Sequence, residues 1–155
     1  MFVSRSVTET LNIGKAIARH GQPGDIVCLF GELGSGKTVL AKGIAAGLGI
    51  KKNEIISPTF VLIRQHLQGK IPLYHFDLYR IGDSHDIPAL GYEEYLYGSG
   101  LSVIEWAERL KYFLPKEYLG VQLLIKGKRS RGMKFEARGR RYQRMLREIY
   151  ADIRH

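Results

Sequence analysis

The stretch Gly31-Glu32-Leu33-Gly34-Ser35-Gly36-Lys37-Thr38 decides the fold of this chain. It matches the phosphate-binding loop G-x-x-x-x-G-K-[ST], in which glycines let successive backbone N–H groups point at one anion. The pattern predicts that Lys37 reaches the β- and γ-phosphates of a nucleotide and that the Thr38 hydroxyl binds Mg²⁺. A helix is expected to begin here, and its N-terminal N–H groups add a partial positive charge that favours the anion.

The residues on either side of this loop decide between a nucleotide site and a plain glycine-rich turn. The apolar run Ile26–Phe30 before the loop predicts a buried strand. After the loop, Leu40, Ile44 and Leu48 recur every four residues, which predicts one face of a helix. Strand, glycine loop and helix in this order are the context that the motif requires, so the sequence favours the nucleotide site.

Two carboxylates stand at the ends of later apolar strands. Asp77 follows a predicted strand over Ile71–Phe76, and Glu105 follows another over Leu101–Ile104. Because α/β sheets bind ligands at the carboxyl edge of their strands, we expect both carboxylates near the loop, where Mg²⁺ and a water need them. Asp77 is predicted to be the Walker-B carboxylate. The alternative is that Asp77 caps a turn.

The rest of the chain predicts an α/β fold of the P-loop NTPase-like type. We expect a sandwich with a central mixed, mainly parallel β-sheet flanked by helices, plus a C-terminal β-hairpin and helix. Residues 1–155 are interpreted as one P-loop ATPase domain with a basic extension over about 126–155. Patterning and turn signals predict these further elements: a strand over Phe2–Ser6, a helix over Glu9–His20 with Thr8 as N-cap, a hairpin of Phe60–Ile63 with Ile71–Phe76, short helices within Gly82–Gly98 with Asp83 or Ser84 as a cap, strands over Tyr118–Ile125 and Met133–Ala137, and a helix over Arg140–Ile153.

The net charge of +9 is concentrated at the C-terminal end. The segment Lys126–His155 holds 11 Lys and Arg against 3 Asp and Glu. Such asymmetry indicates an acidic partner. The apolar face of the terminal helix is expected to dock on the body and to leave its arginines outward, with Arg140, Arg144 and Arg147 on neighbouring turns and Arg141 beside them. Three interpretations stay open: weak tRNA binding, an acidic protein partner, or a solvated face.

Composition excludes several classes of protein. The chain has no apolar segment of 18 residues and no secretory signal pattern, so we expect neither a membrane helix nor secretion. Cys28, the one cysteine, stands in the predicted central strand, where it is expected to be a small buried hydrophobe. A single cysteine fits a reducing cytoplasm. The five histidines show no zinc-binding spacing.

The motif series GELGSGKT, SPTF, HFDLYR and IEW, in this order and spacing, resembles the bacterial TsaE family, also called YjeE. The resemblance covers roughly Thr8–Arg129. It implies a small cytoplasmic P-loop ATPase with ATP and Mg²⁺ as cofactors. It also implies that the partners TsaB and TsaD act with it to make N6-threonylcarbamoyladenosine (t6A) at position 37 of tRNAs that read codons beginning with A.

The resemblance also implies roles for residues. The loop from Gly34 to Thr38 is implied to hold the ATP phosphates, with Lys37 as the main side-chain contact. Thr38 and Glu105 are implied to hold Mg²⁺, directly or through water. Asp77 is implied to orient the waters of the metal or the attacking water. Lys37, Asp77 and Glu105 are therefore the expected catalytic residues.

Three further contacts with the nucleotide are implied in the same way. Thr59, in SPTF, matches a threonine near the γ-phosphate. Trp106 is implied to lie beside the nucleotide. An arginine after the late strand is implied to approach ATP, and Arg129 is its best match. No role is transferred onto the basic extension after Gly132.

Two other classes of function compete with a tRNA-modification ATPase. A P-loop small-molecule or nucleoside kinase usually has a mobile lid rich in arginines, but Gly82–Gly98, where a lid is expected, contains no Arg or Lys. A nucleotide-dependent binding switch with incidental hydrolysis stays open. No N-K-x-D tetrapeptide supports guanine specificity, and no arginine finger is identifiable. Slow hydrolysis that partner proteins stimulate is therefore expected.

Overall fold

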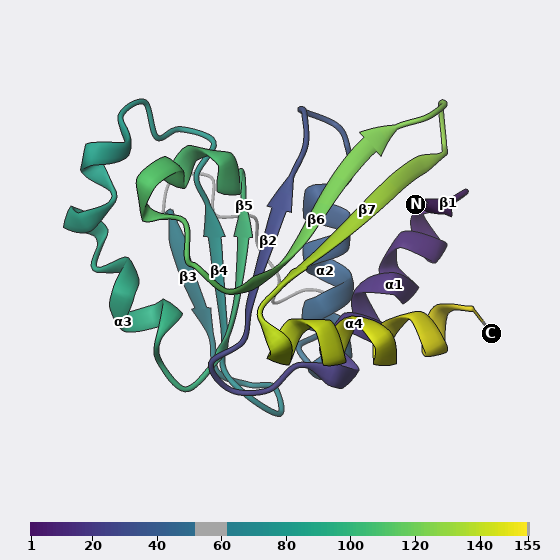
Figure 1. Cartoon of the computed structure of the whole chain (residues 1–155), viewed down its shortest axis with the longest axis horizontal. Helices are drawn as coiled ribbons and strands as arrows, with labels where there is room; N and C mark the ends of the chain where they lie inside the picture. Colours follow the sequence, from purple (N-terminus) through teal and green to yellow (C-terminus); the bar gives the residue numbers. More distant parts are fainter. Residues whose placement is uncertain (52–61, 155) are drawn as a thin grey trace.

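The computed structural model describes residues 1–51 and 62–154, and the strands of this part form one sheet in the order β1-β7-β6-β2-β5-β4-β3 (Figure 1). The strands are β1 (Phe2–Ser4), β2 (Ile26–Phe30), β3 (Ile63–His66), β4 (Leu73–Asp77), β5 (Leu101–Glu105), β6 (Tyr118–Ile125) and β7 (Arg131–Arg138). The helices are α1 (Val7–His20), α2 (Lys37–Gly47), α3 (Tyr92–Leu96) and α4 (Arg140–Ile153). Shorter 3₁₀ segments are η2 (Ser84–Asp86), η3 (Pro88–Leu90) and η4 (Ala107–Phe113).

The directions of the strands confirm a mixed, mainly parallel sheet. Strands β6, β2, β5 and β4 pair in parallel at its centre. Strand β3 pairs antiparallel with β4, β7 with β6, and β1 with β7. Only β3 and β7 therefore oppose the common direction of the described strands. Both predicted hairpins form, but the first strand of the N-terminal one is predicted over Phe60–Ile63, whereas β3 covers Ile63–His66; residues 60 and 61 lie outside the described part.

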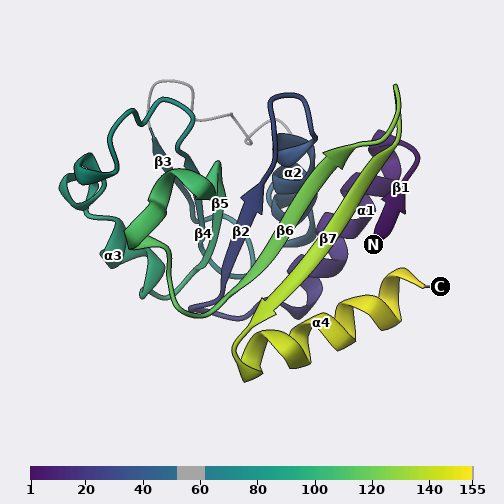
Figure 2. The same cartoon turned by 45° about the horizontal axis from the view of Figure 1, so that its top comes forward.

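Helices cover both faces of this sheet (Figures 1 and 2). On one face α1, α2 and α4 share a core with the sheet, while α3 and η4 pack on the other. The central strand β2 alternates between these cores, since Val27 and Leu29 face the first, and Ile26 and Cys28 face the second. Cys28 is fully buried as predicted, and burial raises the pKa of its thiol.

The start of α1 differs from the prediction. Ser6, not Thr8, is the N-cap, because its hydroxyl accepts a hydrogen bond from the Glu9 N–H at 3.1 Å. Both residue types cap helices, but Ser6 has a glutamate three residues later, and that carboxylate accepts from the backbone N–H of Arg5 at 2.7 Å. The helix therefore begins at Val7. The predicted cap at Asp83 is confirmed by its bond to the His85 N–H.

Helices α1 and α2 approach each other through glycines. A Cβ placed on Gly14 would lie 2.6 Å from the carbonyl oxygen of Leu40, and one on Gly47 would lie 2.6 Å from the Cβ of Ala18. At Gly43, a Cβ would overlap the carbonyl oxygen of Leu11. Because α2 follows the glycine loop, this contact fixes the loop-bearing helix against α1. Among the described residues, no helix is long and apolar enough to span a membrane.

Candidate functional site

The glycine loop joins the end of β2 to the start of α2, as the motif predicts. Gly34 and Gly36 have φ angles of 80° and 105°, in the left-handed region that favours glycine. Gly36 is also the N-cap of α2, and glycine has no side chain that could occupy the first N–H groups of the helix. These N–H groups can therefore receive an anion.

Lys37 is folded back over this loop. It is 4% exposed, and its ammonium donates hydrogen bonds to the carbonyl oxygens of Gly31 and Glu32. The same Nζ lies 3.9 Å from the centre of the Trp106 ring, within range of a cation–π interaction. Burial lowers the pKa of Lys37, and the carboxylates of Glu108 and Glu105 oppose that shift. The loop thus keeps a cation at the place where the motif predicts phosphates.

The two strand-end carboxylates come together because their strands are neighbours. Strands β4 and β5 are parallel, and Asp77 and Glu105 stand opposite each other in the register. Glu105 is almost fully buried, and its Oε1 accepts a hydrogen bond from the Thr38 hydroxyl at 2.7 Å. This contact joins the end of β5 to the start of α2.

The motif analysis did not single out His75, although it lies at the centre of this site. Its Nε2 is 2.5 Å from the Oε2 of Glu105, and both side chains are 2% exposed. His75 therefore holds one oxygen of Glu105 while Thr38 holds the other. The signal was present in HFDLYR, because residues two apart on a strand share a face, which puts His75 on the same side as Asp77.

Asp77 makes the contact that the turn-capping interpretation predicts, and its position leaves the Walker-B interpretation open. Its Oδ1 accepts a hydrogen bond from the Tyr79 N–H at 3.1 Å, so it caps the turn after β4. It also lines the cleft beside Lys37 and Thr38. Burial raises the pKa of Asp77, and the bond from Tyr79 opposes that rise.

These groups line a cleft of about 630 Å³. The β6–β7 hairpin contributes to its wall, and so does the start of α1, which the sequence analysis did not single out. From the hairpin come Arg129, which the sequence analysis singled out, and Lys128 and Arg131, which it did not. Arg131 donates hydrogen bonds to the carbonyl oxygens of Gly127, Ser130 and Gly34. The basic loop sequence was visible, but its pairing with the glycine loop depends on the register of β7.

Trp106 lies next to the P-loop lysine, at the start of the turn after β5. Its φ of 59° is unusual for a residue with a side chain. The ring is half-buried and lies 5.0 Å, centre to centre, from the ring of Tyr79. Trp106 and Tyr79 therefore form an aromatic edge of the cleft. Thr59, the other singled-out contact, lies outside the described residues.

The oxygen donors of the cleft fit Mg²⁺ bound together with a nucleotide. The donors are the Thr38 hydroxyl and the carboxylates of Glu105 and Asp77. No group of three His, Cys, Asp or Glu gathers as a metal cluster within residues 1–51 and 62–154. Mg²⁺ is commonly held by one or two carboxylates together with waters and phosphate oxygens, so a small donor set suits it.

This chain has the features of a P-loop α/β protein. A glycine loop joins a strand to a helix, and carboxylates at the ends of parallel strands lie beside that loop. Within this class, the chain belongs to the TsaE family: the family model described as "Threonylcarbamoyl adenosine biosynthesis protein TsaE" matches residues 4–133. The family belongs to the pathway that makes the t6A modification of tRNA. The resemblance seen in the motifs is thereby confirmed.

Individual relatives agree with this assignment. A protein of Bacillus subtilis (strain 168) called "tRNA threonylcarbamoyladenosine biosynthesis protein TsaE" is 40% identical over 141 residues, which cover 91% of this chain and 87% of the relative. A protein of the same name from Treponema pallidum is 42% identical over 123 residues, covering 79% and 90%. The crystal structure of Bacillus subtilis YdiB superposes with a TM-score of 0.84 at 36% identity, covering 97% of this chain and 93% of YdiB.

Proposed function

We propose that this protein is the Mg²⁺-dependent ATP-binding and ATP-hydrolysing component of the t6A machinery. In this proposal the protein acts with TsaB and TsaD in the cytoplasm. Residues 1–155 form one ATPase domain, and tRNA contacts the basic C-terminal segment of that domain. The observation that carries the ATPase proposal is the buried series His75–Glu105–Thr38 beside Lys37. A buried carboxylate held from both sides is suited to a metal-bound nucleotide.

Each side of the cleft has a separate task in this proposal. The loop residues Gly31–Thr38 receive the phosphates through their N–H groups, and Lys37 exchanges its loop carbonyls for phosphate oxygens. Arg129 lines the opposite wall with a second positive charge. Trp106 covers the Lys37 end of the cleft.

Hydrolysis depends on the two carboxylates. Bound Mg²⁺ neutralises charge on the phosphates. Glu105 keeps a fixed orientation because His75 and Thr38 occupy its two oxygens. Asp77 has one oxygen on the Tyr79 N–H, and we propose that its other oxygen orients a water beside the γ-phosphate. Such positioning is the main contribution that a protein makes to phosphoryl transfer.

The largest hollow outside the cleft that we considered as an acceptor pocket is badly placed for a kinase. This hollow, of about 690 Å³, is lined by Gln22–Ile26, at the edge where β2 begins. The glycine loop follows the opposite end of β2. An acceptor in that hollow would therefore be separated from the γ-phosphate by the length of the sheet. The ATPase is the better supported function.

ATP turnover is expected to be slow for the isolated protein and to rise at least about tenfold with TsaB and TsaD, since an arginine supplied by a partner accelerates other P-loop enzymes far more. The reason is that the sequence identifies no arginine finger, and Arg131 in the cleft wall is already held by three carbonyl oxygens. Steady-state phosphate release with and without the partners measures this. Fast turnover that the partners leave unchanged would contradict the proposal.

Glu105→Gln and Asp77→Asn are each expected to lower kcat at least about a hundredfold while changing ATP affinity little. Both changes keep side-chain shape and remove the charge that the metal and the water need. Phosphate release and nucleotide titration on the same samples separate the two effects. Asp86→Asn is the matched control, because Asp86 is exposed on η2, and it should turn over ATP like the parent. Parent-like turnover in both site variants would exclude these carboxylates.

A further inference from the structure

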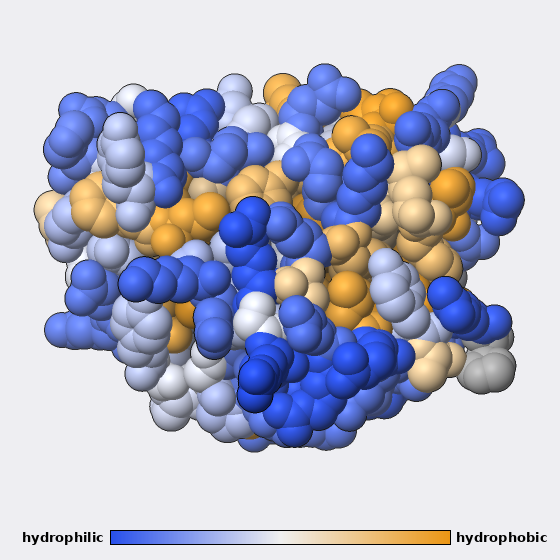
Figure 3. Space-filling view, in the orientation of Figure 1, coloured by the Kyte–Doolittle hydropathy of each residue, from blue (hydrophilic) through white to orange (hydrophobic). Residues whose placement is uncertain are grey.

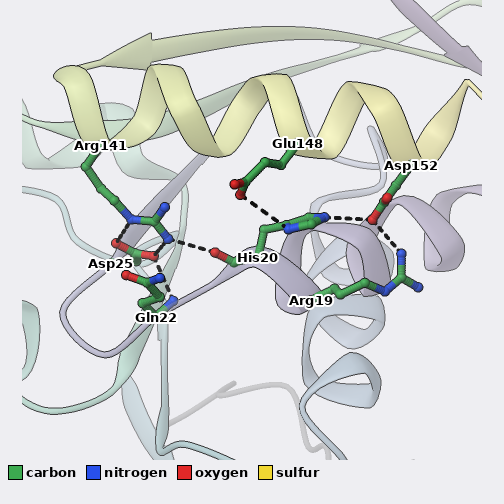
Figure 4. Close-up of polar contacts among 7 residues, drawn as sticks. All are labelled: Arg19, His20, Gln22, Asp25, Arg141, Glu148 and Asp152. Carbon is green, nitrogen blue, oxygen red and sulfur yellow. Dashed lines mark hydrogen bonds and ion pairs between the residues drawn. The ribbon is translucent and has the colours of Figure 1, made fainter.

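The acidic residues of α4 all turn toward the body of the protein (Figure 4). Glu148 lies 3.4 Å from the Nδ1 of His20, and Asp152 lies 2.7 Å from its Nε2. Asp152 also accepts a hydrogen bond from Arg19 at 2.6 Å. These two are the acidic residues of α4, and both are occupied by the end of α1. Glu148 stands four residues after Arg144, but its carboxylate turns toward His20 and makes no ion pair with that arginine.

The first turn of α4 is anchored as well, and this corrects one expectation. Arg141, which we expected to be outward, instead donates to both oxygens of Asp25, at 3.1 and 2.6 Å, and to the carbonyl oxygen of His20 at 2.7 Å (Figure 4). Asp25 is buried, with a side chain 6% exposed, and an arginine within reach provides the charge that it needs. The hydroxyl of Tyr142 accepts a hydrogen bond from the Ile26 N–H at 2.9 Å.

What remains on the outer face of α4 is positive charge without counter-charge. Arg140, Arg144 and Arg147 are exposed, and none of their guanidinium groups makes an ion pair or hydrogen bond with another residue of the described part. At spacings of four and three residues they share one face of the helix. Figure 3 shows a strongly hydrophilic surface at the lower middle of the molecule, where Figure 1 places α4.

We propose that this outer face of α4, defined by Arg140, Arg144 and Arg147, binds the phosphate backbone of RNA. Arginine suits phosphate because its planar guanidinium can donate two parallel hydrogen bonds. The helix is held at both ends and by buried Met145 and Ile149, so the three charges are fixed in position before binding. The identification of this RNA as tRNA rests on the proposed function, whereas the recognition of phosphate does not depend on that function.

The composition of the face favours RNA over an acidic protein. Protein interfaces usually depend on exposed aromatic or apolar anchors in addition to charge. None of the large hydrophobic residues of α4 is exposed, since Tyr142, Met145 and Ile149 are buried and Leu146 is half-buried. A face with guanidinium groups and no apolar anchor complements a charged backbone, and contacts of that kind carry no sequence information.

The test is the salt dependence of RNA affinity in the full chain. The triple variant Arg140→Gln, Arg144→Gln, Arg147→Gln keeps helix-forming side chains and removes three charges. With labelled unmodified tRNA transcript as probe, log affinity against log salt should become shallower by about two to three, since each phosphate contact contributes about 0.7–0.9. Poly(U) should show the same loss, because the contact is to the backbone.

The matched control removes the same charge from elsewhere on the surface. Lys15 is exposed on α1, and Lys70 and Lys116 are exposed in connecting segments, so changing all three to Gln should keep most of the affinity and slope of the parent. Parent-like RNA binding in the arginine triple would overturn the proposal. So would an equal loss in the lysine triple, which would indicate an effect of net charge alone.

Two further outcomes separate this surface from the proposed ATPase function. If the arginine triple loses affinity for TsaB and TsaD but keeps RNA affinity, the face binds protein and the RNA proposal is wrong. Its ATP turnover with the partners should equal that of the parent, because none of the three residues lines the cleft. A parent protein that fails to hydrolyse ATP would refute the proposed function while leaving the RNA result valid.

Discussion

Lys37→Ala is expected to abolish nucleotide binding in a protein that stays folded. The Lys37 ammonium lies within the glycine loop, where it donates to two carbonyl oxygens that phosphate oxygens would replace. Hydrogen bonds to charged groups are worth about 1.5–3 kcal/mol each, so loss of two of them should weaken binding at least about a hundredfold. Titration with a fluorescent ATP analogue measures the affinity.

A thermal melt on the same sample shows whether the variant is folded. The thermal stability should change little. Burial disfavours the charged ammonium of Lys37, as its lowered pKa indicates, and the alanine variant no longer has to bury that charge. Lys42→Ala is the matched control, since Lys42 is half-buried on the same helix but does not line the cleft. It should bind nucleotide like the parent. Unchanged affinity in folded Lys37→Ala would exclude the loop as the phosphate site.

The parts of the site that could be predicted depend on local sequence or on simple rules of sheet geometry. The glycine loop is a contiguous motif, so its conformation and the helix that starts at Lys37 follow from eight residues. Asp77 and Glu105 are far apart in sequence, but both end strands of a parallel sheet. Because such ends meet at one edge, the sequence predicts that both carboxylates lie at that edge. That they stand opposite each other depends on β4 and β5 being neighbours in the sheet.

The parts that could not be predicted depend on which distant segments face each other. Arg141 and Asp25 are separated by 116 positions, and the periodicity of α4 shows only that Arg141 borders the apolar stripe. His75 is a polar residue in a buried strand, and the sequence does not show what satisfies its ring nitrogen. The structure does, because Glu105 lies beside it. Arg131 contacts Gly34 because β7 begins two residues earlier than its apolar pattern indicates.

The glycines between α1 and α2 show that contacts between distant segments of the core are equally hard to predict from sequence. Inside a helix, glycine is less favourable than alanine by about 1 kcal/mol, so sequence alone predicts that Gly43→Ala stabilises α2. In the structure, a Cβ on Gly43 would overlap the carbonyl oxygen of Leu11 and lie 2.9 Å from its Cα. Both obstacles are backbone atoms of α1, which cannot turn aside as a flexible side chain can.

Gly43→Ala is therefore expected to lower the free energy of unfolding by about 3 kcal/mol, at the upper end of the usual range for overpacked cores. Urea unfolding measures it, and the sign alone separates steric overlap from helix propensity. Gly82→Ala is the matched control, because a Cβ there meets no atom within 4 Å and φ is not in the left-handed region, so its stability should be near that of the parent. Gly43→Ala should also weaken nucleotide binding. The added methyl group would push α2 away from α1 and so shift the start of α2, where the glycine loop ends. A Gly43→Ala protein as stable as the parent would show that α1 and α2 do not approach this closely.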